Sequence, residues 1–141
     1  MFDKILLPVD INHPESWANA LPAAKRCAGE GGEIHLLGIV HDLGSAMISS
    51  YLPENFEQTA MENLKAKLEE LAASELSSSD KFETHVGHGH VPETILRIAE
   101  QIGADLIVMA SHPPNDFQTL LVGSNADKVV RHSPIPVLTL R

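Results

Sequence analysis

Five short segments of the chain are rich in apolar residues and are bounded by turn-forming residues. Four of them are apolar at nearly every position, whereas the fifth alternates between apolar and polar side chains. Continuous apolar runs are typical of strands buried on both faces of a parallel sheet, and alternation indicates a strand with one wetter face. The pattern predicts buried strands over residues 4–10, 33–40, 105–111 and 136–141, and a more exposed strand over residues 81–87.

Helical periodicity fills the segments between these runs. Residues 53–76 and 91–102 carry apolar side chains at steps of three and four, which places them on one face of a helix. A third helix is expected over residues 14–29, with a kink or break at Pro22 because proline removes a backbone hydrogen bond. A fourth helix is expected over residues 124–132.

Strand and helix therefore alternate along the whole chain. This alternation predicts right-handed crossovers and a three-layer α/β/α domain with a parallel sheet. A chain of 141 residues has the length of one ordinary domain, so we assign residues 1–141 to a single domain. The long connection at 41–55 is of the kind that forms lids or remains partly disordered.

Charge and composition narrow the classes of function. A formal net charge of -9 argues against nucleic acid or an anionic membrane as the main partner, since both attract basic surfaces. No apolar run at the N-terminus or elsewhere is long enough for a signal peptide or a membrane span, so we expect a cytoplasmic protein. The single cysteine, Cys27, is expected to be a packed thiol rather than a reactive one.

Ligands of open parallel sheets bind at the carboxyl ends of the strands. Asp10 follows the first strand, where its carboxylate is placed to accept a hydrogen bond from a ribose hydroxyl. The spacing fits equally well a role in capping the turn that follows the strand. The strand ends also deliver Pro8, Val9, Val40, His41, Ala110, Ser111 and His112.

Gly123 and Ser124 form a second candidate element, because they precede the last helical pattern. Free backbone N–H groups and the helix dipole make such a terminus a possible anion site. Ser124 and Asp127 also have capping-box spacing, which would satisfy the terminus internally. Neither a GxxxxGK[ST] loop nor a GxGxxG motif occurs in the chain, which argues against the common nucleoside triphosphatase and dinucleotide folds.

Histidines and serines supply no convincing catalytic or metal centre. In "HVGHGH", His85 is expected to point outward while His88 and His90 lie in a turn, so we interpret them as exposed loop histidines rather than metal ligands. Ser111 and His112 are adjacent, but neighbours in a strand point to opposite faces, which argues against a hydrolase dyad. We therefore predict neither catalytic residues nor a metal site.

Three segments together resemble the universal stress protein family, namely "KILLPVD", "GHVPETILRIAEQIGADLIVMASH" and "LLVGSNADKVVRHSPIPVLTLR". The "ASH" followed by "LLVGSNA" is most similar to the short F and G subtypes. The resemblance covers essentially the whole chain. It implies a five-stranded parallel sheet of the adenine nucleotide alpha-hydrolase-like (Rossmann-like) fold, and a homodimer in which residues 136–141 pair across a two-fold axis.

The resemblance also implies an ATP site, with or without Mg²⁺. The family motif G-x2-G-x9-G-[S/T] matches at Gly123 and Ser124, but its first two glycines fall on Ala110 and Pro113. Proline offers no N–H donor and fixes φ, and Pro114 stiffens the same arm. The residues to which the resemblance assigns nucleotide contacts are Pro8, Val9, Asp10, Val40, Ala110, Ser111, His112, Gly123, Ser124 and Asn125.

Two functions follow from these observations. The first is an ATP-binding, homodimeric stress-response protein whose nucleotide biases the 41–55 connection; because no general base stands out, any hydrolysis is expected to be slow. The second is a nucleotide-free dimer that acts as a protein-interaction scaffold, which Pro113 and Pro114 favour. A true phosphotransferase or hydrolase has the least support.

Overall fold

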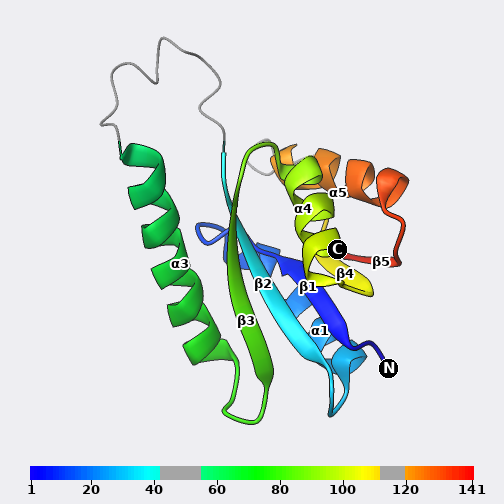
Figure 1. The fold of residues 1–141 in the computed structure, drawn as a ribbon. Coiled ribbons are helices and arrows are strands. Elements are labelled where there is room, and N and C mark those ends of the chain that lie inside the picture. The colour runs from blue at the N-terminus through cyan, green and yellow to red at the C-terminus, as the bar shows by residue number, and fades with distance from the viewer. Residues whose placement is uncertain (42–54, 112–119) are drawn as a thin grey trace.

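A five-stranded parallel sheet forms the centre of the computed structural model (Figure 1). The structure describes residues 1–41, 55–111 and 120–141, without the side chains of residues 120–124. The strands have the spatial order β3-β2-β1-β4-β5, and all four pairings are parallel. They are β1 (Lys4–Pro8), β2 (Glu33–Val40), β3 (Lys81–His88), β4 (Leu106–Ala110) and β5 (Val137–Leu140). All five predicted strands are confirmed, with small differences at their ends.

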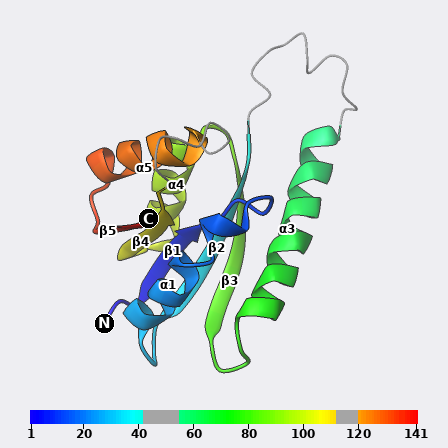
Figure 2. The same cartoon turned by 180° about the vertical axis from the view of Figure 1, so that it is seen from behind.

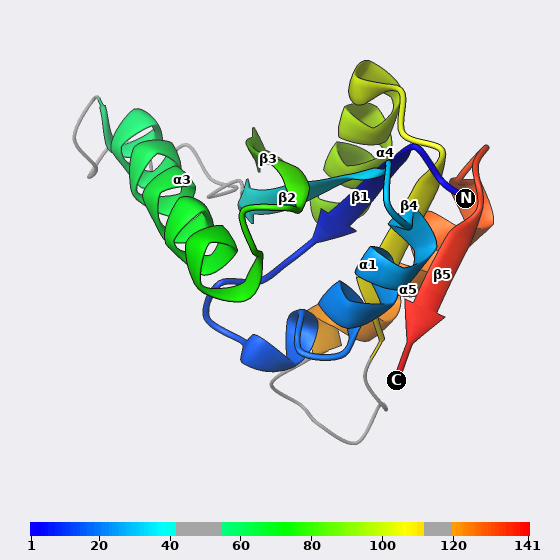
Figure 3. The same ribbon diagram turned by 90° about the horizontal axis from the view of Figure 1, so that it is seen from below.

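Helices cover both faces of the sheet. Helices α1 (Ala20–Ala28) and α3 (Phe56–Glu75) pack on one face, and α4 (Val91–Ile102) and α5 (Leu120–His132) pack on the other. Figure 2 shows α1 lying over the strands, and Figure 3 shows α4 on the opposite side of the sheet. The predicted three-layer α/β/α architecture is therefore correct. None of the helices in the described part of the chain is long and apolar enough to cross a membrane.

Successive side chains of β2 point to opposite faces of the sheet and are buried in two different core layers. Ile34 and Leu36 are buried against α1 and α3, whereas Leu37 is buried against α4. Burying each such side chain contributes roughly 1.5–3 kcal/mol, so both layers hold the strands in register. Cys27 packs at the border of the first layer, as predicted.

The first helical segment differs from its prediction. A short 3-10 helix, η1 (Pro14–Ser16), comes first and α1 begins only at Ala20, so the break precedes Pro22 rather than falling on it. Pro22 is the third residue of α1. In the first turn of a helix the backbone N–H has no intrahelical partner, so proline costs nothing there and the expected kink does not occur.

Helix α5 starts earlier than predicted. It begins at Leu120, so Gly123 and Ser124 lie inside the helix rather than just before it. Ser124 is therefore not the capping residue, and the expected capping box with Asp127 is wrong. The Asp127 carboxylate instead pairs with Arg131 one turn later, at 3.3 Å.

The junction between β1 and β4 is short and is supported by Asp105. The two strands pair over Ile5–Leu106 and Leu6–Ile107 only. The Asp105 carboxylate accepts hydrogen bonds from the backbone N–H groups of Asp3 and Lys4, both at 2.9 Å. Partial burial raises the pKa of Asp105, but these backbone donors outweigh it, so the pKa lies below its ordinary value of 3.8.

Candidate functional site

A cavity of about 330 Å³ opens at the carboxyl ends of β1, β2 and β4. Its volume falls within the range of small-molecule pockets, roughly 300–1,000 Å³. The apolar part of its lining comes from β2, β4, α3, α4 and the chain just after β1, and includes Val9, Leu37, Ile39, Val91 and Met109. Polar groups also line the cavity, among them Asp10, Asn12, Ser16, His41, Asn63, Lys67 and Asn125. A lining that combines such an apolar slot with polar groups suits a flat ring that carries polar substituents.

The cavity brings together half of the ten residues to which the resemblance assigned nucleotide contacts. Pro8, Val9, Asp10, Ala110 and Asn125 all line it, although they come from β1, β4 and α5 and from the chain just after β1. Pro8 and Ala110 thus meet at one edge of the sheet, as the rule for parallel sheets predicts, and Asn125 joins them from α5.

Other candidates lie elsewhere or are not described. Val40 and Ser111 are not among the lining residues. The Val40 carbonyl accepts the Gly89 N–H at 3.1 Å, and the Ser111 N–H donates to the Leu140 carbonyl at 2.6 Å, so both backbones hold the sheet together. His112 and Pro113 lie outside the described residues.

Asp10 caps the turn after β1 and also lines the cavity. One carboxylate oxygen accepts the Asn12 N–H at 3.0 Å, which caps the turn after β1, and the other lies 2.9 Å from Nδ1 of His13. The side chain is 42% exposed and lines the cavity. Because an ionised carboxylate has about four acceptor sites, these two contacts leave room for a hydroxyl donor from a ligand.

Ser16 fixes the backbone that carries Asp10. Its hydroxyl accepts the Asp10 N–H at 2.9 Å and lies 3.1 Å from the Asp10 carbonyl, to which it donates. Ser16 is 4% exposed, and it is one of three buried polar or charged side chains in the described residues. The loop after β1 is thus folded back on itself by a buried hydroxyl, which holds the carboxylate at the mouth of the cavity.

Helix α3 contributes lining residues that the sequence analysis missed. Asn63 and Lys67 are four residues apart, so they lie on one face of α3, beside the apolar Leu64. Lys67 adds a positive charge to the cavity, which suits an anionic ligand. A helical repeat indicates which face is buried, but not which turn of the helix reaches the carboxyl edge of the sheet.

Two of the three histidines of "HVGHGH" are less exposed than predicted. His85 and His88 both belong to β3 and are half-buried, and the Nε2 of His88 lies 2.7 Å from the Glu57 carboxylate of α3. His85 faces the buried His35 of β2, with 2.8 Å between Nε2 and Nδ1. Burial lowers the pKa of His85 and the neighbouring His35 lowers it further, while Glu83 opposes the shift. The expectation that His85 points outward is therefore wrong.

Residues 1–141, the whole chain, match the model of the universal stress protein family. The chain belongs to this family. Its similarity to universal stress protein G of Shigella flexneri, 30% identical over 143 residues and covering 100% of both chains, agrees with the expected subtype.

Solved structures confirm the predicted fold. The hypothetical protein MJ0577 superposes with a TM-score of 0.79 at 27% identity, covering 99% of this universal stress protein and 96% of the other chain. A universal stress protein in complex with cAMP superposes with a TM-score of 0.61, covering 99% and 97% of the two chains. Its identity of 15% shows the shared fold alone.

Proposed function

We propose that this universal stress protein binds ATP, with or without Mg²⁺, in the cavity at the carboxyl edge of the sheet. It acts as a homodimeric regulator in the stress response, in the cytoplasm, with at most slow hydrolysis. The observation that carries the proposal is the cavity itself, in which an apolar slot adjoins the Asp10 carboxylate with acceptor capacity to spare. The solved cAMP complex belongs to a protein of the same fold, so that fold accommodates an adenosine phosphate.

The apolar slot would hold the adenine. Ile39 of β2 and Val91 of α4 line it, and Met109 of β4 offers a polarisable side chain that suits an aromatic ring. Asp10 would accept a hydrogen bond from a ribose hydroxyl. A bond of this kind to a charged acceptor contributes about 1.5–3 kcal/mol.

The phosphates would lie toward the start of α5. The first four backbone N–H groups of a helix lack intrahelical partners, and Gly123 is the fourth residue of α5. Asn125 lines the cavity on the same helix, and Lys67 approaches from α3 with a positive charge. These groups support anion binding although Ala110 and Pro113 replace the usual glycines of the motif.

Slow hydrolysis is expected from the acid–base side chains that line the cavity. The described lining holds one carboxylate, Asp10, and one imidazole, His41, and both Asp10 oxygens already accept hydrogen bonds. A carboxylate held in this way is a poor general base for an attacking water. Nucleotide binding, rather than turnover, is the activity that the site supports.

The homodimer would form through β5. This strand lies at one end of the sheet and pairs on one side with β4. An uncovered edge presents unpaired N–H and C=O groups, and a second copy of the same strand satisfies them. The proposal thus uses residues 136–141 as the dimer strand.

Calorimetric titration of nucleotide-free protein with ATP and Mg²⁺ tests the nucleotide site. Asp10→Asn keeps an acceptor for the Asn12 N–H but removes the charge, so we expect about a 10- to 100-fold weaker binding, which corresponds to losing a charged hydrogen bond. Asp127→Asn removes an exposed carboxylate of α5 that does not line the cavity, and serves as the matched control.

The nucleotide-free scaffold is the competing function. It is favoured by Pro113 and Pro114, which lie outside the described residues. If the wild-type protein gives no heat of binding at millimolar ATP, the scaffold function holds and the ATP proposal fails. Release of an adenine nucleotide when the purified protein is denatured would exclude the scaffold function.

A further inference from the structure

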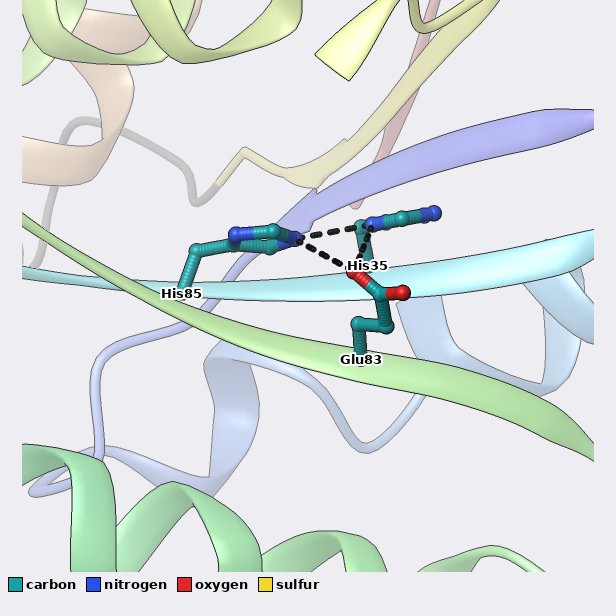
Figure 4. Close-up of side chains that lie close together, drawn as sticks. All are labelled: His35, Glu83 and His85. Atoms are coloured by element: carbon teal, nitrogen blue, oxygen red, sulfur yellow. Dashed lines mark hydrogen bonds and ion pairs between the residues drawn. The ribbon is translucent and has the colours of Figure 1, made fainter.

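Two histidines and a glutamate meet on the face of the sheet that α4 covers, outside the cavity. His35 of β2 pairs in register with Glu83 of β3, and His85 lies two residues further along β3 on the same face (Figure 4). We call these three residues the His–Glu cluster. None of them lines the cavity.

The nitrogen and oxygen atoms of the cluster converge on one point. Nδ1 of His35 lies 2.8 Å from Nε2 of His85, and both nitrogens lie 3.7 Å from the same carboxylate oxygen of Glu83. Tetrahedral coordination with metal–ligand bonds near 2.0–2.1 Å separates neighbouring ligand atoms by about 3.3 Å. The three distances in the cluster bracket this value.

His35 is oriented for ligation by a second carboxylate. It is 3% exposed, and its Nε2 lies 3.1 Å from Glu33 Oε2. With Nε2–H donating to Glu33, the neutral ring presents the lone pair of Nδ1 to the cluster. Metal-ligating histidines characteristically donate their other ring N–H to a carboxylate, which fixes both the tautomer and the orientation of the ring.

The short contact between the two imidazoles needs a proton or a cation between them, because two lone pairs repel. The rings stack with centroids 5.1 Å apart and an interplanar angle of 17°. Without a metal, His85 donates Nε2–H to His35. With a metal, the His85 proton moves to Nδ1, Nε2 becomes a ligand, and the two nitrogens separate by a few tenths of an ångström. His85 is on an edge strand and half-buried, so this movement is available to it.

We infer that the His–Glu cluster is a binding site for a divalent transition-metal ion of the zinc type. His35, His85 and Glu83 supply two nitrogens and one oxygen, a set of ligands that Zn²⁺ accepts with water in the fourth position. The Glu83 side chain is 65% exposed, so the cluster borders solvent that would supply this water. The ion would tie the edge strand β3 to β2, at the end of the sheet opposite β5, and so does not depend on nucleotide binding or on the dimer.

Titration of metal-free, full-length protein with Zn²⁺ tests this inference. We expect one ion per chain for the wild type, at least 100-fold weaker binding for His85→Ala, and 10- to 100-fold weaker binding for Glu33→Ala through the lost orientation of His35. His88→Ala is the matched control, because it removes a histidine of the same strand that pairs with Glu57 of α3 instead, and it should bind Zn²⁺ like the wild type.

Two further measurements keep the test decisive. Glu83→Ala changes an exposed side chain, so it should fold normally and still bind Zn²⁺ at least 10-fold more weakly. Co²⁺ in place of Zn²⁺ should give the intense visible absorption of a four-coordinate ion, and this absorption should be absent in His85→Ala. The inference fails if the wild type does not bind Zn²⁺, or if His85→Ala and His88→Ala weaken binding equally, which would indicate scattered surface histidines.

Discussion

The two edges of the sheet are built differently. The β3 edge is an eight-residue strand that pairs with β2 along its whole length, and α3 packs against both strands. The β5 edge is a four-residue strand joined to β4, which is itself attached to β1 over two residue pairs. One edge is thus held by a long ladder and a helix, while the other is short and lightly attached.

This difference indicates the structural role of each edge strand. Charged residues such as Lys81 and Glu83 line the β3 edge, and charges on an edge strand discourage pairing with another chain. In β5, Val137, Leu138 and Leu140 are half-buried and apolar, which suits a strand completed by a second copy. The protected edge is suited to carry a site within one chain, and the open edge is suited to assembly.

The largest expected effect is on the dimer, and it is tested by placing a proline in each of the two edge strands. Ile107 N–H donates to Pro136 O and Ser111 N–H donates to Leu140 O, so the Thr139 N–H between them points away from β4. Thr139→Pro removes that outward donor and leaves the pairing with β4 intact. We expect light scattering to show a dimer for the wild type and a monomer for this variant at the same concentration.

Thr84→Pro is the matching change on β3. Gly89 N–H donates to Val40 O, so odd-numbered residues of β3 face β2 and the Thr84 N–H points outward. We expect this variant to keep the oligomeric state of the wild type. A dimer that survives Thr139→Pro, or that dissociates with Thr84→Pro, would assign the interface to a different surface.

The second prediction concerns how α3 secures the β3 side. A methyl group on Gly38 of β2 would lie 2.9 Å from both Cγ and Cδ2 of Leu64, on the face where α3 packs. Gly38→Ala should therefore push α3 outward and lower the free energy of unfolding by about 1–3 kcal/mol in urea titrations. Gly31→Ala is the control, because nothing lies within 4 Å of its added methyl group. Equal stability of the two variants would show that α3 is held only loosely.

The third prediction concerns the short pairing of β1 with β4, which connects β4 and β5 to the rest of the sheet. Asp105→Asn replaces one acceptor oxygen by a donor that faces a backbone N–H, so we expect the free energy of unfolding to fall by about 1 kcal/mol at pH 7. The folded-state pKa of Asp105 is lowered from 3.8, so its stabilising contribution is complete above that value and is lost as the pH falls through the lower folded pKa. Urea titrations at pH 7 and pH 3 should show the gap between wild type and variant shrinking in acid. A gap independent of pH would contradict the assignment.

The smallest expected effect is at the ion pair between α3 and the β3 edge. His88 Nε2 and Glu57 Oε1 are 2.7 Å apart, but the two side chains are 30% and 63% exposed. Exposed pairs contribute about 0–1 kcal/mol, so Glu57→Gln should lower the free energy of unfolding by about 0.5 kcal/mol or less. A double-mutant cycle with His88→Ala measures the coupling directly. A coupling of several kcal/mol would mean that this pair, rather than apolar packing, holds α3 on the sheet.

The sequence predicted the layers of the fold better than the ends of its elements. Apolar runs and helical repeats reflect which side chains are buried, and burial of apolar side chains contributes most of the free energy of folding. The five strands and the buried faces of α3 and α4 could therefore be predicted from the sequence. Helix ends depend on one or two backbone hydrogen bonds. The start of α5 at Leu120 and the break before Ala20 are therefore decided by local geometry that the pattern does not encode.

The same distinction applies to the candidate sites, where the sequence predicted some of the residues that meet and only the tertiary structure placed the others. The sequence by itself determined the parallel sheet, and with it the meeting of Pro8, Asp10 and Ala110 at one edge, because parallel strands all end on the same side. Only the tertiary structure decided that Lys67 reaches the same cavity and that His35 faces His85. Those contacts join residues of different elements, and they depend on the register of β2 with β3 and on the position of α3 along the sheet, which no local pattern specifies.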